Sequence, residues 1–192
     1  MIRGIVLSGV GGQGLITLGK ILGKALMKTG YYVKVAETHG LSQRGGSVIV
    51  HIKYSDEKYF SPTVAPGLAD IYVSLELIEA VRNLYMVKKD AIIVVNDLIL
   101  PPPASSYIPS REELLNELKK FKHLYIVNAS KIASEIGFIA ATNIVILGYL
   151  IGKNILDINY EKVVESLKET INKKYHEANI EALEKGYKIA LK

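Results

Sequence analysis

The chain has 192 residues, 49% of them hydrophobic, which suits one α/β domain with a core large enough to fold alone. It contains no cysteine, and this excludes disulfides, thiolate chemistry and iron–sulfur ligation by the chain itself. The formal net charge of +5 could favour acidic partners, but most lysines fall in the C-terminal third at helical spacing, without an aromatic-studded basic patch. We therefore expect no nucleic-acid partner.

The first residues enter a strand-like run almost at once, without the charged leader, apolar region and cleavage site of a signal peptide. This predicts a cytoplasmic protein. The most membrane-like segment runs from Ile136 to Ile151, but Thr142 and Asn143 interrupt it, and it is shorter than the roughly 20 apolar residues that a span requires. We expect a buried or interface helix there and no membrane partner.

Six apolar runs have the pattern of strands, and most are separated by segments of helical periodicity. The runs are Ile2–Leu7, Tyr32–Glu37, Ser47–Tyr54, Ile71–Ser74, Ala91–Asn96 and Leu124–Asn128. This alternation predicts an α/β fold of one domain over residues 1–192, with three αβα layers and a mainly parallel, Rossmann-like sheet. The third run follows the second too closely for a helical crossover, so it should form an antiparallel arm.

The helical segments follow from apolar spacing and from breakers at their ends. They are Leu15–Thr29, Arg111–Lys120, Ser130–Gly137, Asn143–Ile151, Tyr160–Lys173 and His176–Ala190. Thr142 is the expected cap of the helix that begins at Asn143. Three consecutive prolines, Pro101 to Pro103, make the stretch from Asp97 to Pro109 a stiff surface loop.

A glycine-rich loop lies between the first strand and the first helix. Four glycines in the six residues from Gly9 to Gly14 allow backbone N–H groups to gather around a ligand, and the helix N-terminus offers partial positive charge to an anion. The residues expected to contact a phosphate or carboxylate are Gly9, Gly11, Gly12, Gln13 and Gly14. The alternative is that the glycines only make a tight strand-to-helix turn.

The spacing of these glycines also permits a dinucleotide site. Gly9, Gly11 and Gly14 fit the pattern G-x-G-x-x-G, and Glu37 lies where an acid could meet a ribose hydroxyl. A nicotinamide-dependent dehydrogenase is therefore one alternative. The region after Lys120 offers no persuasive acid–base pair for hydride chemistry, which weighs against it.

A second cluster, ETHGLSQRGGS from Glu37 to Ser47, starts at the carboxyl end of the second strand. In a doubly wound sheet this end lies beside the first glycine loop, so the two motifs should share one crevice. Arg44 can grip a carboxylate or phosphate with two hydrogen bonds, and the glycines beside it permit close approach of a bound group or a neighbouring chain. The candidate contacts are Thr38, Ser42, Gln43, Arg44, Gly45 and Gly46. The alternative is a polar turn whose arginine points into solvent.

His39 is a candidate proton shuttle because histidine titrates near neutrality, although an isolated histidine is more often a structural, hydrogen-bonded residue. The other histidines are far apart in the chain and lack ligand spacing, so no metal site is expected. Arg44 and His39 are the only catalytic candidates.

Together, GVGGQG near the N-terminus and SQRGGSV after the second strand resemble the gamma-type subunits and domains of the 2-oxoacid:ferredoxin oxidoreductases. Within this family THGLSQRGGSV is most similar to the beta subunits of the indolepyruvate branch, whereas the pyruvate branch typically reads more like YGxExRGG. The resemblance covers nearly the whole chain in length and order. Either motif alone would be weak evidence for the family.

The resemblance implies a subunit of a complex that oxidatively decarboxylates aryl pyruvates, such as indolepyruvate, to aryl-acetyl-coenzyme A and reduces ferredoxin. It implies that thiamine diphosphate, magnesium and iron–sulfur clusters lie on a large alpha-type partner subunit, with coenzyme A as cosubstrate. The sequence agrees, because it has no cysteine for a cluster and no GDG followed by a paired asparagine motif. The chain would then bind no cofactor alone and be inactive alone.

In that setting, Arg44 would position the substrate carboxylate or a coenzyme phosphate. Two alternatives stay open within the same motifs. The first is the gamma subunit of another 2-oxoacid:ferredoxin oxidoreductase, acting on pyruvate, 2-ketoisovalerate or 2-oxoglutarate. The second is a noncatalytic assembly module in which the glycines only permit close contact between chains.

Overall fold

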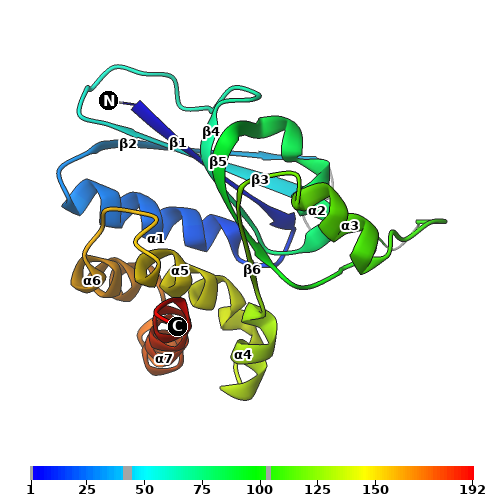
Figure 1. Ribbon diagram of the computed structural model, residues 1–192. Coiled ribbons are helices and arrows are strands. Elements are labelled where there is room, and N and C mark those ends of the chain that lie inside the picture. The colour runs from blue at the N-terminus through cyan, green and yellow to red at the C-terminus, as the bar shows by residue number, and fades with distance from the viewer. Residues whose placement is uncertain (1, 41–44, 103–104) are drawn as a thin grey trace.

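A computed structural model describes residues 2–40, 45–102 and 105–192. Its strands are β1 (Ile2–Val10), β2 (Tyr32–His39), β3 (Ser47–Ser55), β4 (Ala69–Ser74), β5 (Val87–Asn96) and β6 (His123–Val127). They form a six-stranded sheet in the order β2-β3-β1-β4-β5-β6 (Figure 1). The pairings β1–β4, β4–β5 and β5–β6 are parallel, whereas β3 is antiparallel to both β1 and β2. The predicted α/β class with a mostly parallel sheet is confirmed.

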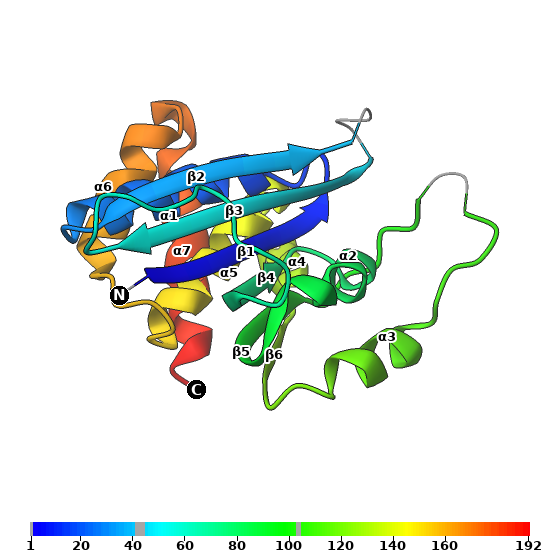
Figure 2. The same ribbon diagram turned by 90° about the horizontal axis from the view of Figure 1, so that it is seen from above.

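Helices cover both faces of the sheet, which gives the three expected layers. The helices are α1 (Leu15–Lys28), α2 (Leu77–Arg82), α3 (Arg111–Leu118), α4 (Ala129–Glu135), α5 (Thr142–Gly152), α6 (Tyr160–Thr170) and α7 (His176–Ala190). Short 3-10 turns are η1 (Leu84–Met86), η2 (Ile139–Ala141) and η3 (Lys173–Tyr175). The core cluster on one face joins the sheet to α1, α4, α5, α6 and α7, and the cluster on the other face joins it to α2 and α3 (Figures 1 and 2).

β1 lies in the middle of the sheet, and its sequence shows why. Ile5 and Leu7 belong to the core cluster beneath α1, and Val6 between them belongs to the cluster beneath α2. A strand that is buried on both faces reads as a continuous apolar run. Because β1 is packed on both faces, it fixes the position from which the glycine-rich loop that ends at Gly14 begins.

The segment Ser47–Tyr54 has a different position from the predicted arm. Its antiparallel pairing with the preceding strand is confirmed, but β3 lies between β1 and β2 and hydrogen-bonds to both. As a result the carboxyl ends of β1 and β2 and the amino end of β3 lie at the same edge of the sheet (Figure 2). β2 becomes an edge strand.

The predicted cap of α5 is wrong. Thr142 is the first residue of the helix rather than its cap, and its hydroxyl donates to the carbonyl of Ile139 at 2.8 Å. The preceding turn η2 leads directly into the helix, so the backbone enters without a side-chain cap. The helix is nearly all buried, as expected for this apolar segment. No helix in the described ranges is long and apolar enough to cross a membrane.

Helix α2 had no counterpart among the expected helices, and α6 ends earlier than expected. The sequence of α2 is only six residues long, which is too short to establish a helical period. Directly after α6, Ile171 has an extended backbone (φ −99°, ψ 144°). Asn172 then caps η3, and its side-chain Oδ1 accepts from the N–H of Lys174. A polar side chain of this kind diverts the chain from the helix.

Candidate functional site

The two glycine-bearing motifs meet at one edge of the sheet. The N–H of Gly11 donates to the carbonyl of Gly46 at 2.8 Å, and the N–H of Gly45 donates to the carbonyl of Gly11 at 3.3 Å. Gly45 has φ +73°, a left-handed conformation that glycine adopts without strain. The two motifs are therefore brought together at one edge of the sheet, as expected, and a ligand-binding crevice shared by both stays a prediction. Both the N–H and the carbonyl of Gly11 thus take part in the junction, by which we mean the two hydrogen bonds that join Gly11 to Gly45 and Gly46.

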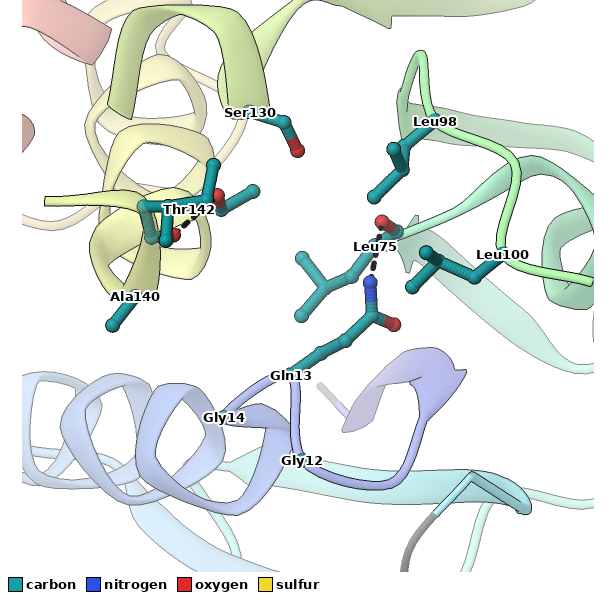
Figure 3. Close-up of a pocket in the computed structure, with 10 residues that line it drawn as sticks. Gly12, Gln13, Gly14, Leu75, Leu98, Leu100, Ser130, Ala140 and Thr142 are labelled. Carbon is teal, nitrogen blue, oxygen red and sulfur yellow. Dashed lines mark hydrogen bonds between the residues drawn. The ribbon is translucent and has the colours of Figure 1, made fainter. Parts of the chain in front are cut away.

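The first loop is held in shape by Gln13. Its Nε2 donates to the carbonyl of Leu75 at 3.1 Å (Figure 3). Its Oε1 accepts from the N–H of Val10 at 2.7 Å. A Cβ on Gly9 would lie 2.6 Å from the same Oε1, so Gly9 makes room for this side chain. The geometry shows that Gln13 and Gly9 shape the loop itself, and their expected contact with a ligand stays a prediction.

The loop ends in the N-cap of α1. Gly14 has φ +80°, and its carbonyl accepts a 3.0 Å hydrogen bond from Nδ2 of Asn143 at the start of α5. A Cβ at this position would lie 2.5 Å from that nitrogen, so close packing as well as φ requires glycine. Asn143 is 4% exposed, and its Oδ1 is buried without a hydrogen-bond partner in the described residues.

Gly12 differs from the other glycines of the loop. It has φ +106°, it is exposed, and a Cβ there would meet no atom of the described residues within 4 Å. The backbone at Gly12 is thus open to an approaching group. It also lies beside the N-terminus of α1, where the partial positive charge of a helix favours anions.

A cavity of about 440 Å³ opens next to this loop (Figure 3). Its lining is mostly apolar and comes from Gly12, Gln13, Gly14, Leu75, Leu98, Leu100, Ser130, Ile139, Ala140 and Thr142. These residues follow the carboxyl ends of β1, β4, β5 and β6, with the rest from the turn before α5. Ligands of open α/β sheets bind outside the carboxyl ends of the strands, at the point in the sheet where the chain changes the direction in which it adds strands.

The carbonyl of Leu75 organises the base of the cavity. Besides Gln13, it accepts a 3.0 Å hydrogen bond from Nδ2 of Asn96, which is fully buried at the end of β5. The same Nδ2 lies 2.8 Å from Oγ of Ser130, and Oδ1 of Asn96 accepts from the N–H of Ser130 at 3.1 Å. One backbone carbonyl and one asparagine therefore fix the ends of β4 and β5 and the start of α4 against the first loop.

The second motif is described only in part. Thr38 and His39 are exposed at the end of β2, and Nδ1 of His39 lies 3.1 Å from the carbonyl of Gly40. Leu41, Ser42, Gln43 and Arg44 lie outside the described residues, so their expected roles stay predictions. The structure gives His39 no acid or base partner among the described side chains.

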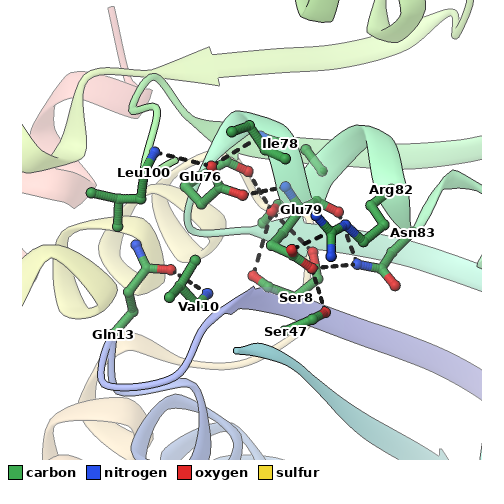
Figure 4. A network of polar contacts seen from close by, with 12 residues as sticks. Ser8, Val10, Gln13, Ser47, Glu76, Ile78, Glu79, Arg82, Asn83 and Leu100 are labelled. Atoms are coloured by element: carbon green, nitrogen blue, oxygen red, sulfur yellow. Dashed lines mark hydrogen bonds and ion pairs between the residues drawn. The ribbon is translucent and has the colours of Figure 1, made fainter. Parts of the chain in front are cut away.

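A network of buried polar side chains lies behind the two motifs (Figure 4). Its acidic members are Glu76, which is fully buried, and Glu79, which is 3% exposed. Glu76 is the N-cap of α2: its carboxylate accepts from the N–H groups of Ile78 at 2.9 Å, of Glu79, and of Leu100 at 3.4 Å. Burial raises the pKa of Glu76, and these backbone donors oppose that rise.

Sequence reasoning missed both glutamates and Asn143. Glutamate is not a usual N-cap residue, because Ser, Thr, Asp and Asn reach the backbone more easily. The available signal was two glutamates three residues apart, Glu76 and Glu79, the first of them two residues after a strand that ends in serine. Asn143 carried no such signal, because its partner Gly14 is remote in the chain.

The strand order also bears on the dinucleotide alternative. In that arrangement the strand with the acidic residue lies directly beside the strand that leads into the glycine loop. Here β3 separates β1 from β2, so exposed Glu37 is a full strand farther from the loop. A dinucleotide bound at the glycine loop would therefore lack the acidic residue that binds its ribose hydroxyl. Among the described residues no group of three histidine, aspartate or glutamate side chains could hold a metal ion.

Comparison with known proteins assigns the chain to a family. The model of the family described as pyruvate ferredoxin/flavodoxin oxidoreductase matches residues 4–189. The chain belongs to this family. The resemblance inferred from the two motifs is thus confirmed, and the chain is a gamma-type subunit of an oxidoreductase complex.

Several members of this family match along nearly their whole length. Indolepyruvate oxidoreductase subunit IorB of Archaeoglobus fulgidus is 38% identical over 192 residues, covering 97% of this chain and 94% of that protein. The common gamma subunit of the pyruvate/ketoisovalerate oxidoreductases of Pyrococcus furiosus is 32% identical over 182 residues, covering 93% of this chain and 92% of that protein.

A solved structure shares the fold. It is the 2-oxoglutarate:ferredoxin oxidoreductase of Magnetococcus marinus with 2-oxoglutarate, coenzyme A and succinyl-CoA bound. Its TM-score is 0.75 at 20% sequence identity, and the match covers 98% of this chain but 31% of that longer chain. The gamma-type fold thus also occurs as one part of a larger polypeptide.

Proposed function

We propose that this chain is the cofactor-free subunit of a cytoplasmic indolepyruvate:ferredoxin oxidoreductase. The complex converts an aryl pyruvate and coenzyme A to aryl-acetyl-coenzyme A and carbon dioxide, and the two electrons released reduce two ferredoxins. Thiamine diphosphate, magnesium and iron–sulfur clusters on a larger alpha-type partner supply the decarboxylation and the electron transfer. The absence of cysteine from this sequence fits that division, because cluster ligation normally requires thiolates.

The observation that carries the proposal is the joining of the two glycine bends by Gly11 and Gly46 beside an apolar cavity. Around the mouth of this cavity, Leu100 and Ile139 are 36% and 59% exposed. Apolar side chains gathered at an exposed pocket are typical of a surface that another molecule covers. This face therefore completes a cleft against the larger subunit.

Within that cleft the open backbone at Gly12 and the N-terminus of α1 suit an anionic group of coenzyme A or of the 2-oxoacid. The second motif contributes further contacts from Thr38, from Ser42 to Arg44, and from the Gly45–Gly46 bend. Arg44 is the residue that positions the anion, because a guanidinium binds carboxylate or phosphate with paired hydrogen bonds. Gly11 has both backbone groups engaged, so it supports the site from behind.

The choice of indolepyruvate rests on the relatives. The relative named for indolepyruvate is 38% identical, and the one named for pyruvate and ketoisovalerate is 32% identical. The motif THGLSQRGGSV points in the same direction. A gamma subunit for pyruvate, 2-ketoisovalerate or 2-oxoglutarate is the competing assignment, and a substrate panel separates the two.

Reconstitution tests the proposal. The chain is expressed with and without the large subunit encoded beside it, and ferredoxin reduction and acyl-coenzyme A formation are measured with indolepyruvate, phenylpyruvate, pyruvate, 2-ketoisovalerate and 2-oxoglutarate. We expect no turnover from either subunit alone and the highest kcat/KM with an aryl pyruvate. Full turnover by the large subunit alone would reject the proposal. A preference for pyruvate, 2-ketoisovalerate or 2-oxoglutarate would move the chain to the competing branch.

Calorimetric titration of the isolated chain with NADH and with coenzyme A addresses the dehydrogenase alternative separately. We expect no heat of binding with NADH beyond a buffer blank. Saturable NADH binding that is lost in Gly12→Val would support the dehydrogenase instead.

A further inference from the structure

Glu79 is a buried carboxylate with three side-chain partners (Figure 4). One oxygen accepts hydrogen bonds from the hydroxyl of Ser47 and, at 3.2 Å, from Nδ2 of Asn83. The other oxygen lies 3.2 Å from Nε of Arg82. A buried charge destabilises the fold unless it is fully partnered, so this set of contacts holds each partner firmly.

Ser47 connects this carboxylate to the glycine junction. It is the first residue of β3, it follows Gly45 and Gly46 directly, and it pairs with Val10 in the β1–β3 register. One residue earlier, the carbonyl of Gly46 accepts from the N–H of Gly11. The end of the second bend is thus fixed from two sides, by Gly11 of the first loop and by Glu79 of α2.

We propose that Glu79 is a positioning residue that acts through Ser47 to hold the Gly45–Gly46 bend against the first glycine loop. This inference rests on the proposed function, because it takes the joined bends as the face that meets the substrates and the larger subunit. A charged acceptor makes a shorter and stronger hydrogen bond than a neutral one. Such a bond restricts the glycine pair beside Ser47, which is useful because glycine has more backbone conformations open to it than other residues.

Helix α2, which carries Glu79, is anchored independently of Ser47. The hydroxyl of Tyr72 lies 3.0 Å from the carbonyl oxygens of both Glu79 and Ala80, and 2.6 Å from Oγ of Ser8. Removing this hydroxyl weakens the same network without touching the Ser47 contact. Tyr72→Phe is therefore the matched control for a loss of stability alone.

The test uses Glu79→Ala, Glu79→Gln, Ser47→Ala and Tyr72→Phe. Hydrogen–deuterium exchange of the segment 45–49 is measured in the isolated full chain, and KM and kcat are measured in the reconstituted complex. A hydrogen bond to a charged group contributes about 1.5–3 kcal/mol, or roughly ten- to a hundredfold. For Glu79→Ala we expect at least about tenfold faster exchange of this segment and about a tenfold higher KM for coenzyme A or the 2-oxoacid, with kcat reduced far less.

The other variants show whether Glu79 acts through Ser47. Ser47→Ala should reproduce both effects, and the double variant should be no worse than either single one, because the two residues act through one contact. Glu79→Gln keeps an acceptor for Ser47 and should recover most of the wild-type KM. Tyr72→Phe should lower the unfolding midpoint while the KM stays unchanged.

Unchanged exchange in Glu79→Ala and Ser47→Ala would overturn the inference, as would an equal rise of KM in Tyr72→Phe. Faster exchange with unchanged KM would show that the contact is only structural and would overturn the positioning role. Should Glu79→Ala fail to fold, Ser47→Ala decides the question. Failure of the proposed function is a separate result, since it appears as full turnover of the complex lacking this chain, whatever the exchange data show.

Discussion

The N–H of Gly11 and the carbonyl of Gly46 form a 2.8 Å hydrogen bond that joins two loops from different parts of the chain. The bond exists because β3 pairs with β1 in a register that places Ser47 opposite Val10. Both loops are rich in glycine. Joined in this way they form one surface.

Gly14→Ala should destabilise the isolated chain by about 2 kcal/mol or more, because a positive φ alone costs a non-glycine residue about 1–3 kcal/mol. The new Cβ would in addition meet Nδ2 of Asn143. Urea unfolding measures the change. Gly40→Ala is the control, since no atom of the described residues lies within 4 Å of its added Cβ and its φ is not in the left-handed region. Equal stability of the two variants would contradict the assigned packing of Gly14.

The buried Oδ1 of Asn143, which has no hydrogen-bond partner among the described residues, allows a second test. Asn143→Leu loses the hydrogen bond to Gly14 but also removes a buried, unsatisfied acceptor, so the net loss of stability should be within about 1 kcal/mol. Asn143→Asp should cost several times more, because it places a carboxylate against the carbonyl of Gly14. Thermal unfolding at pH 7 compares the two variants. A leucine variant less stable than the aspartate variant would refute this account.

His51 should make the stability depend on pH. It is 6% exposed, its Nδ1 accepts from the N–H of Val64 at 3.3 Å, and burial lowers its pKa below the usual 6.5. The folded chain then binds fewer protons than the unfolded chain, so this contribution is complete above about pH 6.5 and is lost as the pH falls. Urea midpoints between pH 8 and pH 5 should drop less in His51→Asn, which keeps an acceptor. Parallel curves for the two proteins would contradict the prediction.

Arg44→Ala should lower turnover of the reconstituted complex by about tenfold or more, through loss of a charge-assisted contact. The unfolding midpoint of the chain should not change. Lys119→Ala removes an exposed positive charge on the other layer and should leave both quantities at the wild-type level. Wild-type kinetics in Arg44→Ala would remove this arginine from the site.

Ile139 at the cavity mouth should contribute to binding of the larger subunit. Ile139→Glu places a charge where a partner would bury an apolar side chain, and we expect the Kd between subunits to rise about tenfold or more. Leu191→Glu is the matched control, because Leu191 is 64% exposed at the end of α7. Surface plasmon resonance measures both. A similar effect of the two substitutions would point to a general charge effect rather than to this interface.

Much of the architecture followed from sequence alone. The continuous apolar run Ile5–Leu7 is typical of a strand buried on both faces, and α1 and α7 show clear helical periodicity, so local patterns sufficed. The family also followed from sequence, because GVGGQG and SQRGGSV are specific when they occur together.

Tertiary structure decided what local patterns cannot encode. The insertion of β3 between β1 and β2 depends on pairing between remote segments, and α2 is too short to have a period of its own. The same holds for the contact of Ser47 with Glu79 and of Gly14 with Asn143, since each joins residues far apart in the chain. Sequence determines which residues favour strand, helix or turn. Only packing decides which of those turns meet, because burial and hydrogen bonding are satisfied by the whole fold rather than by any one segment.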